Sequence, residues 1–364
     1  MATKKAELHL YLFGASSGES IVIQLPDWSW AVIDCFSTSS KDVRTNLAYD
    51  LLKSRGVREL AFLCLTHPHA DHFSGMSRLV RDFKIRKFWG FGGLQPPDFD
   101  LLKTFFQADA ATSSNRLDAD ARERSAEISE LFDGIRAGGI RTQAVAARTL
   151  IYPESVDGRS SLRIWGLAPS GRHTDDYRRC LLKSTRGRRF KSALPRADHN
   201  LISSALLIQF GRTRIILGGD VEVEGWRDVL NDKPVDDLSA HAVKVSHHGS
   251  KNGFCPGLWD RFSAGDMPVA ILTPFASKAL PQREALDHIQ ARASSIHSAA
   301  VLRHDESSFP TAPDPRFTRI RAMLAAKARA RLSGSGQKGG ACHLIFDNRG
   351  HYTLEHEGEA GRIA

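Results

Sequence analysis

The sequence predicts an α/β fold in which strands and helices alternate, with a helical segment inserted between two similar halves. Three observations lead to this prediction. Short apolar strand candidates alternate with helical spacing in residues 8–89, whereas residues 90–198 lose this pattern and carry a long charged helical stretch. Residues 201–300 then return to strands and helices. In both halves, an apolar strand leads directly into a motif rich in histidine or aspartate.

The first quarter of the chain gives the clearest alternation. Strands are indicated by short apolar or β-branched runs between turn residues, and helices by apolar residues three or four apart, such as Val43, Leu47 and Leu51. The expected strands are residues 8–13, 20–25, 28–34, 60–65 and 85–89. The expected helices are residues 42–55 and 73–83.

The middle of the chain follows no single period. Pro96 and Pro97 interrupt residues 90–145, and residues 117–136 predict a charged helix that we expect to cover the core. Residues 149–152 and 162–167 return to strand character. Residues 172–196 hold nine arginine and lysine residues with little apolar periodicity, which predicts a flexible basic loop.

The last part of the chain again predicts strands and helices. A hairpin is expected around Gly211 and Arg212. The expected strands are residues 201–210, 214–217, 242–245, 269–272, 343–346 and 351–354. The expected helices are residues 281–293 and 317–332, the second of them basic and amphipathic. We therefore expect a main domain over residues 1–305, with an insertion at about 90–198, and an extension over residues 306–364 packed on the same domain.

Charge and cysteine content limit the classes of function. The formal net charge is +9 and the pI about 9.4, which favours anionic partners, among them DNA and RNA. The five cysteines are scattered and form no CxxC pair, which favours a reducing, cytoplasmic location. No apolar run is long enough for a membrane helix, and the first residues lack the features of a secretory signal. We expect no membrane partner, and the sequence leaves protein partners open.

The strongest chemical signal is the run Thr66-His67-Pro68-His69-Ala70-Asp71-His72, which follows an apolar strand. A turn between a strand and a helix can direct alternate side chains toward two neighbouring points. His67 and His69 then suit one metal ion, and Asp71 and His72 suit a second. Imidazole nitrogens and carboxylate oxygens are ligands that zinc accepts, with manganese as the next choice.

This run resembles the THxHxDH signature of metallo-β-lactamase-fold hydrolases. The resemblance implies a four-layer αββα sandwich and two divalent metal ions. It also implies a bridging role for Asp220, which ends the strand-like run Ile215-Ile216-Leu217-Gly218-Gly219-Asp220 and matches the family's bridging aspartate. Asp34 ends another apolar strand, where the resemblance implies a residue that supports the active-site loops or a plain turn former.

Further matches resemble the ComEC-like branch of this family. Ser246-His247-His248-Gly249-Ser250 is similar to its HHGS motif, which implies that one of the two histidines completes the second metal site. His247 is favoured as the ligand because it continues directly from a strand. His248 could then act as general acid or orient the leaving group, and the reverse assignment stays open. His199 either completes the first site or is a loop histidine. Gly14–Gln24 departs from the branch's Gly-Gln-Gly-Asp pattern.

A two-metal centre makes hydroxide available near neutral pH, and Asp71 and Asp220 would hold it in line with the substrate. The basic run contributes candidate substrate contacts at Arg186, Arg188, Arg189 and Lys191. We therefore expect a phosphodiesterase or nuclease acting on nucleic acid or nucleotides. A hydrolase of small esters, lactones or thioesters is the first alternative, and a metal-containing accessory subunit of a larger assembly is the second.

Overall fold

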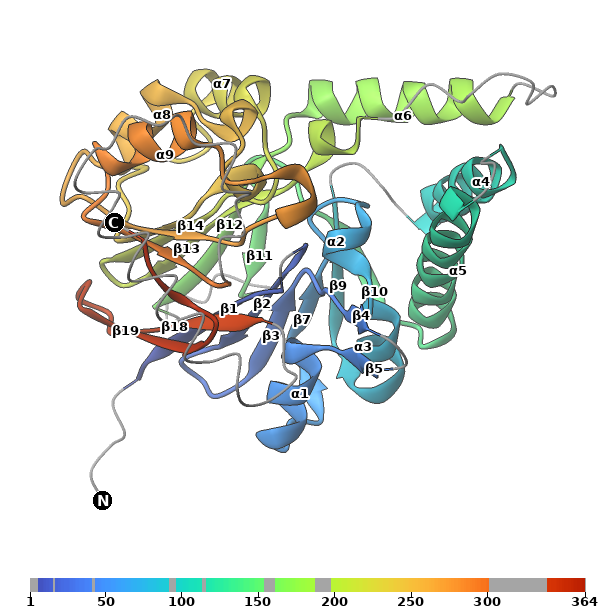
Figure 1. The fold of residues 1–364 in the computed structure, drawn as a ribbon, viewed down its shortest axis with the longest axis horizontal. Helices are drawn as coiled ribbons and strands as arrows, with labels where there is room; N and C mark the ends of the chain where they lie inside the picture. The colour runs from blue at the N-terminus through green and yellow to red at the C-terminus, as the bar shows by residue number, and fades with distance from the viewer. Residues whose placement is uncertain are drawn as a thin grey trace.

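Two mixed β-sheets lie face to face in the computed structural model, with helices on their outer faces (Figure 1). The structure describes residues 6–15, 17–40, 43–91, 96–112, 116–153, 161–186, 198–300 and 339–363. The predicted four-layer αββα sandwich is confirmed. None of the described helices combines the length and the apolar character needed to cross a bilayer.

The first sheet joins strands from both ends of the chain. Its strands run in the order β10 (Arg141–Ala144), β9 (Lys87–Gly90), β7 (Phe62–Cys64), β3 (Trp30–Ile33), β2 (Glu19–Gln24), β1 (Leu8–Gly14), β18 (Gly340–Phe346) and β19 (Tyr352–Gly358). The β18–β19 hairpin pairs antiparallel with β1 along its whole length. Strands β3, β7, β9 and β10 are parallel. The expected closing hairpin is thus part of the main sheet.

The second sheet is built from the later half of the chain. Its strands run in the order β11 (Leu150–Tyr152), β12 (Leu162–Ala168), β13 (Ala205–Phe210), β14 (Thr213–Leu217), β15 (Ala242–Lys244), β16 (Val269–Leu272), β17 (Ser295–Ser298) and β20 (Gly361–Arg362). Strands β14 to β17 are parallel, so their carboxyl ends lie at one edge of the sheet.

Three apolar clusters separate the four layers. The central cluster lies between the two sheets and contains Leu10 of the first sheet and Ile208 of the second. A second cluster packs the first sheet against its helices through residues such as Leu63 and Leu79, and a third packs the second sheet against its helices through Trp226 and others. Because each sheet buries both faces, its central strands are apolar almost throughout, which is why their sequences lack polar alternation.

Short helices cover the two outer faces. The first sheet carries α1 (Leu47–Ser54) and α3 (Met76–Asp82), while α2 (Ala70–Phe73) follows the motif at residues 66–72. The second sheet carries α7 (Val223–Asp232), α8 (Pro256–Phe262) and α9 (Arg283–Gln290). Gly75, with φ of 92°, separates α2 from α3, so the single helix expected at residues 73–83 is two.

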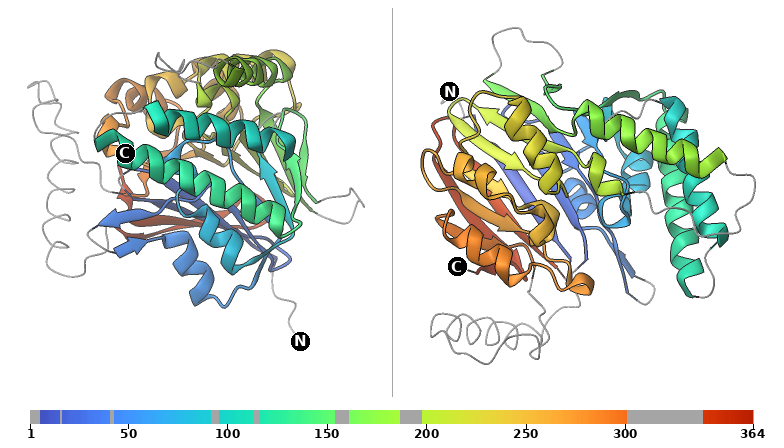
Figure 2. Two further views of the ribbon diagram at one scale, coloured as in Figure 1. Left: turned by 90° about the vertical axis from the view of Figure 1, so that its right-hand side faces the viewer. Right: turned by 90° about the horizontal axis from the view of Figure 1, so that it is seen from above.

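The described residues of the predicted insertion form three helices, which lie on one side of the sandwich (Figure 2), while its strands β10, β11 and β12 belong to the two main sheets. The three helices are α4 (Pro96–Thr112), α5 (Arg116–Ala137) and α6 (Gly171–Arg186). Helix α5 is close to the predicted range, but α4 was not predicted because its two prolines suggested a break. Proline is tolerated in the first turn of a helix, where its missing N–H would have no helical partner.

The basic loop expected at residues 172–196 is wrong over its first half. Residues 171–186 form helix α6, and residues 187–197 lie outside the described residues. Tyr177 and Leu181, four residues apart, are fully buried and hold the helix against the core. These two apolar positions, surrounded by charged residues, were too weak a pattern to predict a helix from the sequence. The predicted helix at residues 317–332 also lies outside the described part of the chain.

Candidate metal centre

The candidate site lies where parallel strands of both sheets end. Strand β3 leads to Asp34 and β7 leads to the motif at residues 66–72, while β14 leads to Asp220 and β15 to the histidine pair at 247–248. Ligand sites in α/β sheets form at the carboxyl ends of parallel strands, where loops bring side chains from distant segments together.

The side chains at this edge form two groups of possible metal donors. One group contains His67, His69 and Asp220, and the other contains Glu19, His72, Asp220 and His248. Within each group one candidate ligand atom per residue lies within 4.8 Å of the others. Asp220 is 2% exposed and is shared by both groups. A carboxylate has two oxygens and can therefore face two cations at once.

The first group brings two nitrogens to a common point. His67 Nε2 and His69 Nδ1 are 2.9 Å apart, and His67 Nε2 lies 3.8 Å from Asp220 Oδ2. Burial lowers the pKa of His67 well below its usual value, so the ring stays neutral. Two imidazole lone pairs directed at one point repel each other unless a proton or a metal cation lies between them. This arrangement suits a divalent ion.

The second group lies near both oxygens of Asp220. His72 Nε2 lies 3.5 Å from Asp220 Oδ1, and His248 Nε2 lies 3.6 Å from Asp220 Oδ2. Asp71 Oδ2 is 3.5 Å from His72 Nε2 and 3.2 Å from His248 Nε2. His72 Nε2 and Asp220 Oδ1 are buried, and neither has a hydrogen-bond partner among the described residues. Buried polar atoms without partners are costly, and facing atoms of this kind fit a shared metal ion.

A layer of hydrogen bonds fixes how these histidines face the centre. Asp34 Oδ2 accepts hydrogen bonds from His72 Nδ1 at 2.7 Å and from the Thr66 hydroxyl at 2.6 Å. Because Thr66 gives its only hydroxyl proton to Asp34, its oxygen must accept from His67 Nδ1, 3.1 Å away. His248 Nδ1 donates to the Thr273 carbonyl at 2.7 Å. In all three rings Nε2 is then left with a lone pair toward Asp220, as a metal ligand requires.

The electrostatics of the second group favour a cation. Burial alone would favour a neutral carboxyl, yet His248 and His72 hold the pKa of Asp220 well below its usual range. Burial likewise opposes a charged His72 ring, but the surrounding carboxylates, Asp220 foremost, raise its pKa well above the usual value. Carboxylates that attract a proton this strongly attract a divalent cation for the same reason.

His199 lies beside the first group, in an aromatic enclosure. Its ring is 5.1 Å from that of His69 between centroids, although it is not part of either donor group. The rings of Phe105 and Phe106 lie 5.7 and 5.8 Å away, and the Tyr177 hydroxyl is 2.7 Å from His199 Nδ1. The inserted helices α4 and α6 therefore hold this histidine against the motif.

The structure places His248, and not the favoured His247, in the donor group. Residues 246–249 form a tight 3₁₀ turn in which both histidines adopt φ near +50°, so the strand does not continue straight into His247 as expected. His247 instead lies near the surface, with Nδ1 3.2 Å from Glu222 Oε1 and Nε2 3.4 Å from Asn200 Nδ2. His248 is buried with its Nε2 atom 3.2 Å from Asp71 Oδ2, and its role as general acid stays a prediction.

Two buried residues of the site were not predicted. Glu19 belongs to the second donor group, and Lys244 of β15 lies 2.5 Å from its Oε2 atom. Glu19 is a charged residue at the start of a predicted apolar strand, and Lys244 is a charged residue inside another. Both signals were present in the sequence, but neither alone distinguishes a site residue from a turn or edge residue.

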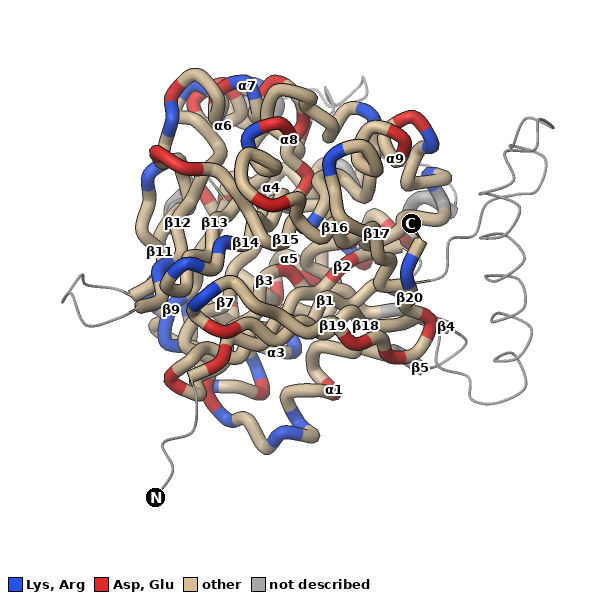
Figure 3. The backbone as a smooth tube through the Cα atoms, turned by 90° about the vertical axis from the view of Figure 1, so that its left-hand side faces the viewer, with Lys and Arg blue, Asp and Glu red and all other residues tan. Residues whose placement is uncertain are grey.

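The candidate substrate contacts are largely outside the described residues. Arg188, Arg189 and Lys191 lie in residues 187–197, and of Arg186 only the backbone, at the end of α6, is described. Earlier arginines of α6 form ion pairs: Arg172 with Asp228, Arg178 with Asp98 and Arg179 with Asp176. On the face shown in Figure 3, basic and acidic residues are interspersed over the elements.

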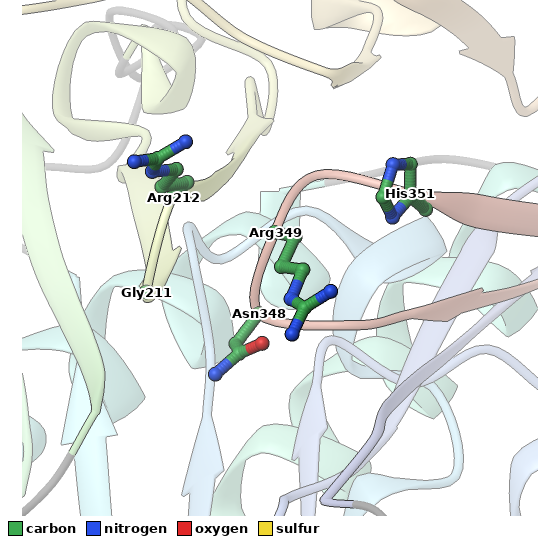
Figure 4. Close-up of a pocket in the computed structure, with 5 residues that line it drawn as sticks. All are labelled: Gly211, Arg212, Asn348, Arg349 and His351. Carbon is green, nitrogen blue, oxygen red and sulfur yellow. The ribbon is translucent and has the colours of Figure 1, made fainter.

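A separate surface hollow lies at the other end of β14, between the turn after β13 and the turn after β18. It is lined by Gly211, Arg212, Asn348, Arg349 and His351. The guanidinium groups of Arg212 and Arg349 point in different directions, so they do not converge on one ligand (Figure 4). Within the part of the chain that the structure describes, the groups of possible metal donors lie at the strand ends that carry Asp220.

The two sheets and their helices have the arrangement of the metallo-β-lactamase sandwich, and the strand ends offer donors for divalent metal ions. Residues 14–139, which include the motif at 66–72, match the family model of the Metallo-beta-lactamase superfamily. This part of the chain is thus similar to a domain of that superfamily.

Comparison with known proteins gives distant likenesses. A search of curated proteins gives no match. A mutant of the CmlA beta-hydroxylase is 11% identical, with a TM-score of 0.42 over 84% of this chain and 54% of that chain. Zn²⁺-bound PqqB from Methylobacterium extorquens is 12% identical, with a TM-score of 0.42 over 79% and 97%. A diphosphatase from the PhnP family is 10% identical, with a TM-score of 0.36 over 76% and 90%. This chain spans about half the length of the CmlA chain.

Proposed function

We propose that this protein hydrolyses its substrate with two divalent metal ions bound at the strand ends. The observation that carries the proposal is that Asp220 belongs to both donor groups. His67 and His69 would hold the first ion together with Asp220, and His199 would complete that site. The ligands of the second ion would be Asp71, His72, His248 and Asp220.

The ions would activate water and offset negative charge that develops on the substrate. Asp71 is the donor with a partly open side, since its side chain is 16% exposed, and it would orient the attacking water. His247, 21% exposed and held by Glu222, is placed to give a proton from its ring to the leaving group. The roles of the two adjacent histidines are thus the reverse of the favoured assignment.

Zinc is the metal that this donor set fits best. The donors are imidazole nitrogens and carboxylate oxygens, both of which zinc accepts, and manganese is the second choice because it also accepts carboxylates. The HHGS motif supports membership of the ComEC-like branch. The five cysteines, all within the described residues, form no disulfide, which supports a reducing, cytoplasmic location.

The substrate class we propose is a phosphodiester in nucleic acid or a nucleotide. The support is the net charge of +9 together with the basic run that precedes His199. A small ester, lactone or thioester is the second candidate. It is favoured by the Phe275 ring, 5.2 Å from that of His248, which would face an apolar acyl group.

A substrate panel tests both candidates. Purified protein is analysed for zinc and manganese and assayed on bis(p-nitrophenyl) phosphate, single-stranded DNA, RNA and a lactone. We expect phosphodiester turnover that falls at least about 100-fold in Asp220→Asn. Turnover of the lactone alone would support the second candidate, and bound metal without turnover of any substrate would favour the accessory-subunit alternative.

Charge neutralisation separates the role of the candidate substrate contacts at residues 186–191 from that of overall charge. Arg186, Arg188, Arg189 and Lys191 are changed together to glutamine, and the matched control changes ion-paired arginines of α6, Arg172 and Arg179. We expect a rise in KM for nucleic acid only in the first variant, with a weaker dependence on salt. Equal effects in both variants would contradict the proposed contact.

A further inference from the structure

A buried ion pair joins Glu19, a member of the second donor group, to Lys244. Lys244 and Glu19 are 1% exposed each, and Lys244 Nζ lies 2.5 Å from Glu19 Oε2. Lys244 comes from β15 of the second sheet and Glu19 from β2 of the first sheet, so the pair joins the two sheets beneath the site. Burying two charges is costly, and a well-packed apolar pair would often be at least as stable. Stability alone therefore does not explain why these two charged residues are paired here.

Lys244 also holds the turn that presents Asp220. Its Nζ atom donates a hydrogen bond to the Gly219 carbonyl at 3.0 Å and lies 4.0 Å from Asp220 Oδ1. Gly219 has φ of 50°, a conformation that few other residues adopt readily. The ammonium group thus fixes the backbone immediately before the aspartate that both donor groups share.

Glu19 links Lys244 to His248 through Thr273. Its Oε2 atom accepts a hydrogen bond from the Thr273 hydroxyl at 2.7 Å, and the carbonyl of Thr273 accepts from His248 Nδ1. Glu19 also lies 3.8 Å from the Nδ1 atoms of His72 and His248, on the side of each ring away from Asp220. Its Oε1 atom has no hydrogen-bond partner among the described residues.

The position of Glu19 needs the lysine. A buried carboxylate without a cation would compete with Asp34 for the proton on His72 Nδ1, or would turn toward the donor atoms themselves. Lys244 holds it behind the rings, where it supports the orientation in which Nε2 of each histidine faces Asp220. Loss of the lysine would therefore disturb Asp220 and His248 together.

We propose that Lys244, acting with Glu19, is a positioning residue that sets the geometry of the second metal site. The inference rests on the proposed function, because it assumes that the donor group binds a metal ion. It assigns no contact between Lys244 and the ion. Lys244 acts through the Gly219 carbonyl and through Glu19.

The test measures metal binding rather than turnover. Lys244→Met and Glu19→Gln are purified metal-free, and zinc affinity and stoichiometry are measured by competition with a chelator. The visible spectrum of the Co²⁺-loaded protein reports the coordination geometry. We expect Lys244→Met to lose about 10- to 100-fold in affinity for the second zinc ion and to alter the Co²⁺ spectrum. Glu19→Gln, which can still accept from Lys244 and Thr273, should lose less.

The controls distinguish positioning from simple stability. Lys87, a second buried lysine, lies over the Trp89 ring in the first sheet, and Lys87→Met should lower thermal stability without changing zinc affinity. If Lys244→Met does not fold, Lys244→Gln keeps a hydrogen-bond donor without the charge and should show an intermediate loss of affinity.

The outcomes separate this inference from the proposed function. Wild-type affinity, stoichiometry and Co²⁺ spectrum in the folded Lys244 variant would overturn the positioning role and leave the two-metal proposal intact. Failure of the wild-type protein to bind any divalent ion would instead overturn the two-metal proposal, and this inference with it. A fall in the stability of the metal-free Lys244 variant with unchanged zinc affinity would also overturn the positioning role.

Discussion

Removal of the Tyr177 hydroxyl should weaken the first metal site while leaving the fold intact. In Tyr177→Phe the ring still packs beside His199, but the 2.7 Å contact between the hydroxyl and His199 Nδ1 is lost. A buried polar atom left without its partner costs about 1–3 kcal/mol. Loss of a residue that orients a metal-binding histidine lowers metal affinity by about 10- to 100-fold, or about 1.4–2.8 kcal/mol. The two figures agree, so we expect a fall within this range.

Chelator competition measures the affinity of each zinc ion in the wild-type protein and in Tyr177→Phe. The matched control is Tyr152→Phe, which removes a hydroxyl 2.7 Å from Asp27 Oδ2, outside the donor groups. We expect only the Tyr177 variant to lose affinity at the first zinc site. Equal zinc affinities in all three proteins would refute the reasoning, because His199 would then be neither a ligand nor oriented by the inserted helix.

Three further predictions concern other parts of the molecule. His248→Gln should remove one zinc ion whereas His247→Gln should keep both and lower turnover, and metal analysis with a kinetic assay decides whether the roles are instead reversed. Glu127 of α5 accepts from two backbone amides at the start of α3, at 3.0 and 3.2 Å. Glu127→Ala should therefore lower the free energy of unfolding by about 1–2 kcal/mol in urea titration, and no change would exclude this capping role. Burial lowers the pKa of His297 from 6.5 to about 4, so the unfolded chain takes up its proton first and stability falls as pH decreases from 6.5 toward 4. After allowance for partial exposure the loss is about 1 kcal/mol, and His297→Gln should flatten this part of the stability profile.

Local signals in the sequence were sufficient to predict much of the fold and the residues at the centre of the site. The motif at residues 66–72 is specific because four donors of the right chemistry follow a buried strand within a few residues. Asp220 was found because it ends a strand of the same kind. In both places the sequence order alone determines which side chains stand at the end of a strand.

Residues that depend on the tertiary arrangement could not be predicted in the same way. The choice between His247 and His248 turns on a 3₁₀ turn with left-handed backbone, which no residue type in the motif requires. Tyr177 reaches His199 only because the charged segment around it is helical. Glu19 and Lys244 lie on strands more than 200 residues apart in the sequence, and only the packing of the two sheets brings them together.

The position of Asp34 has a consequence for the way the site is filled. One carboxylate orients His72 directly and His67 through Thr66, so each donor group contains a ring that depends on it. An ion entering either half would restrict the motions of Asp34 and thereby prepare the other half. Uptake of the pair should then be cooperative, with the singly loaded protein scarce during a titration.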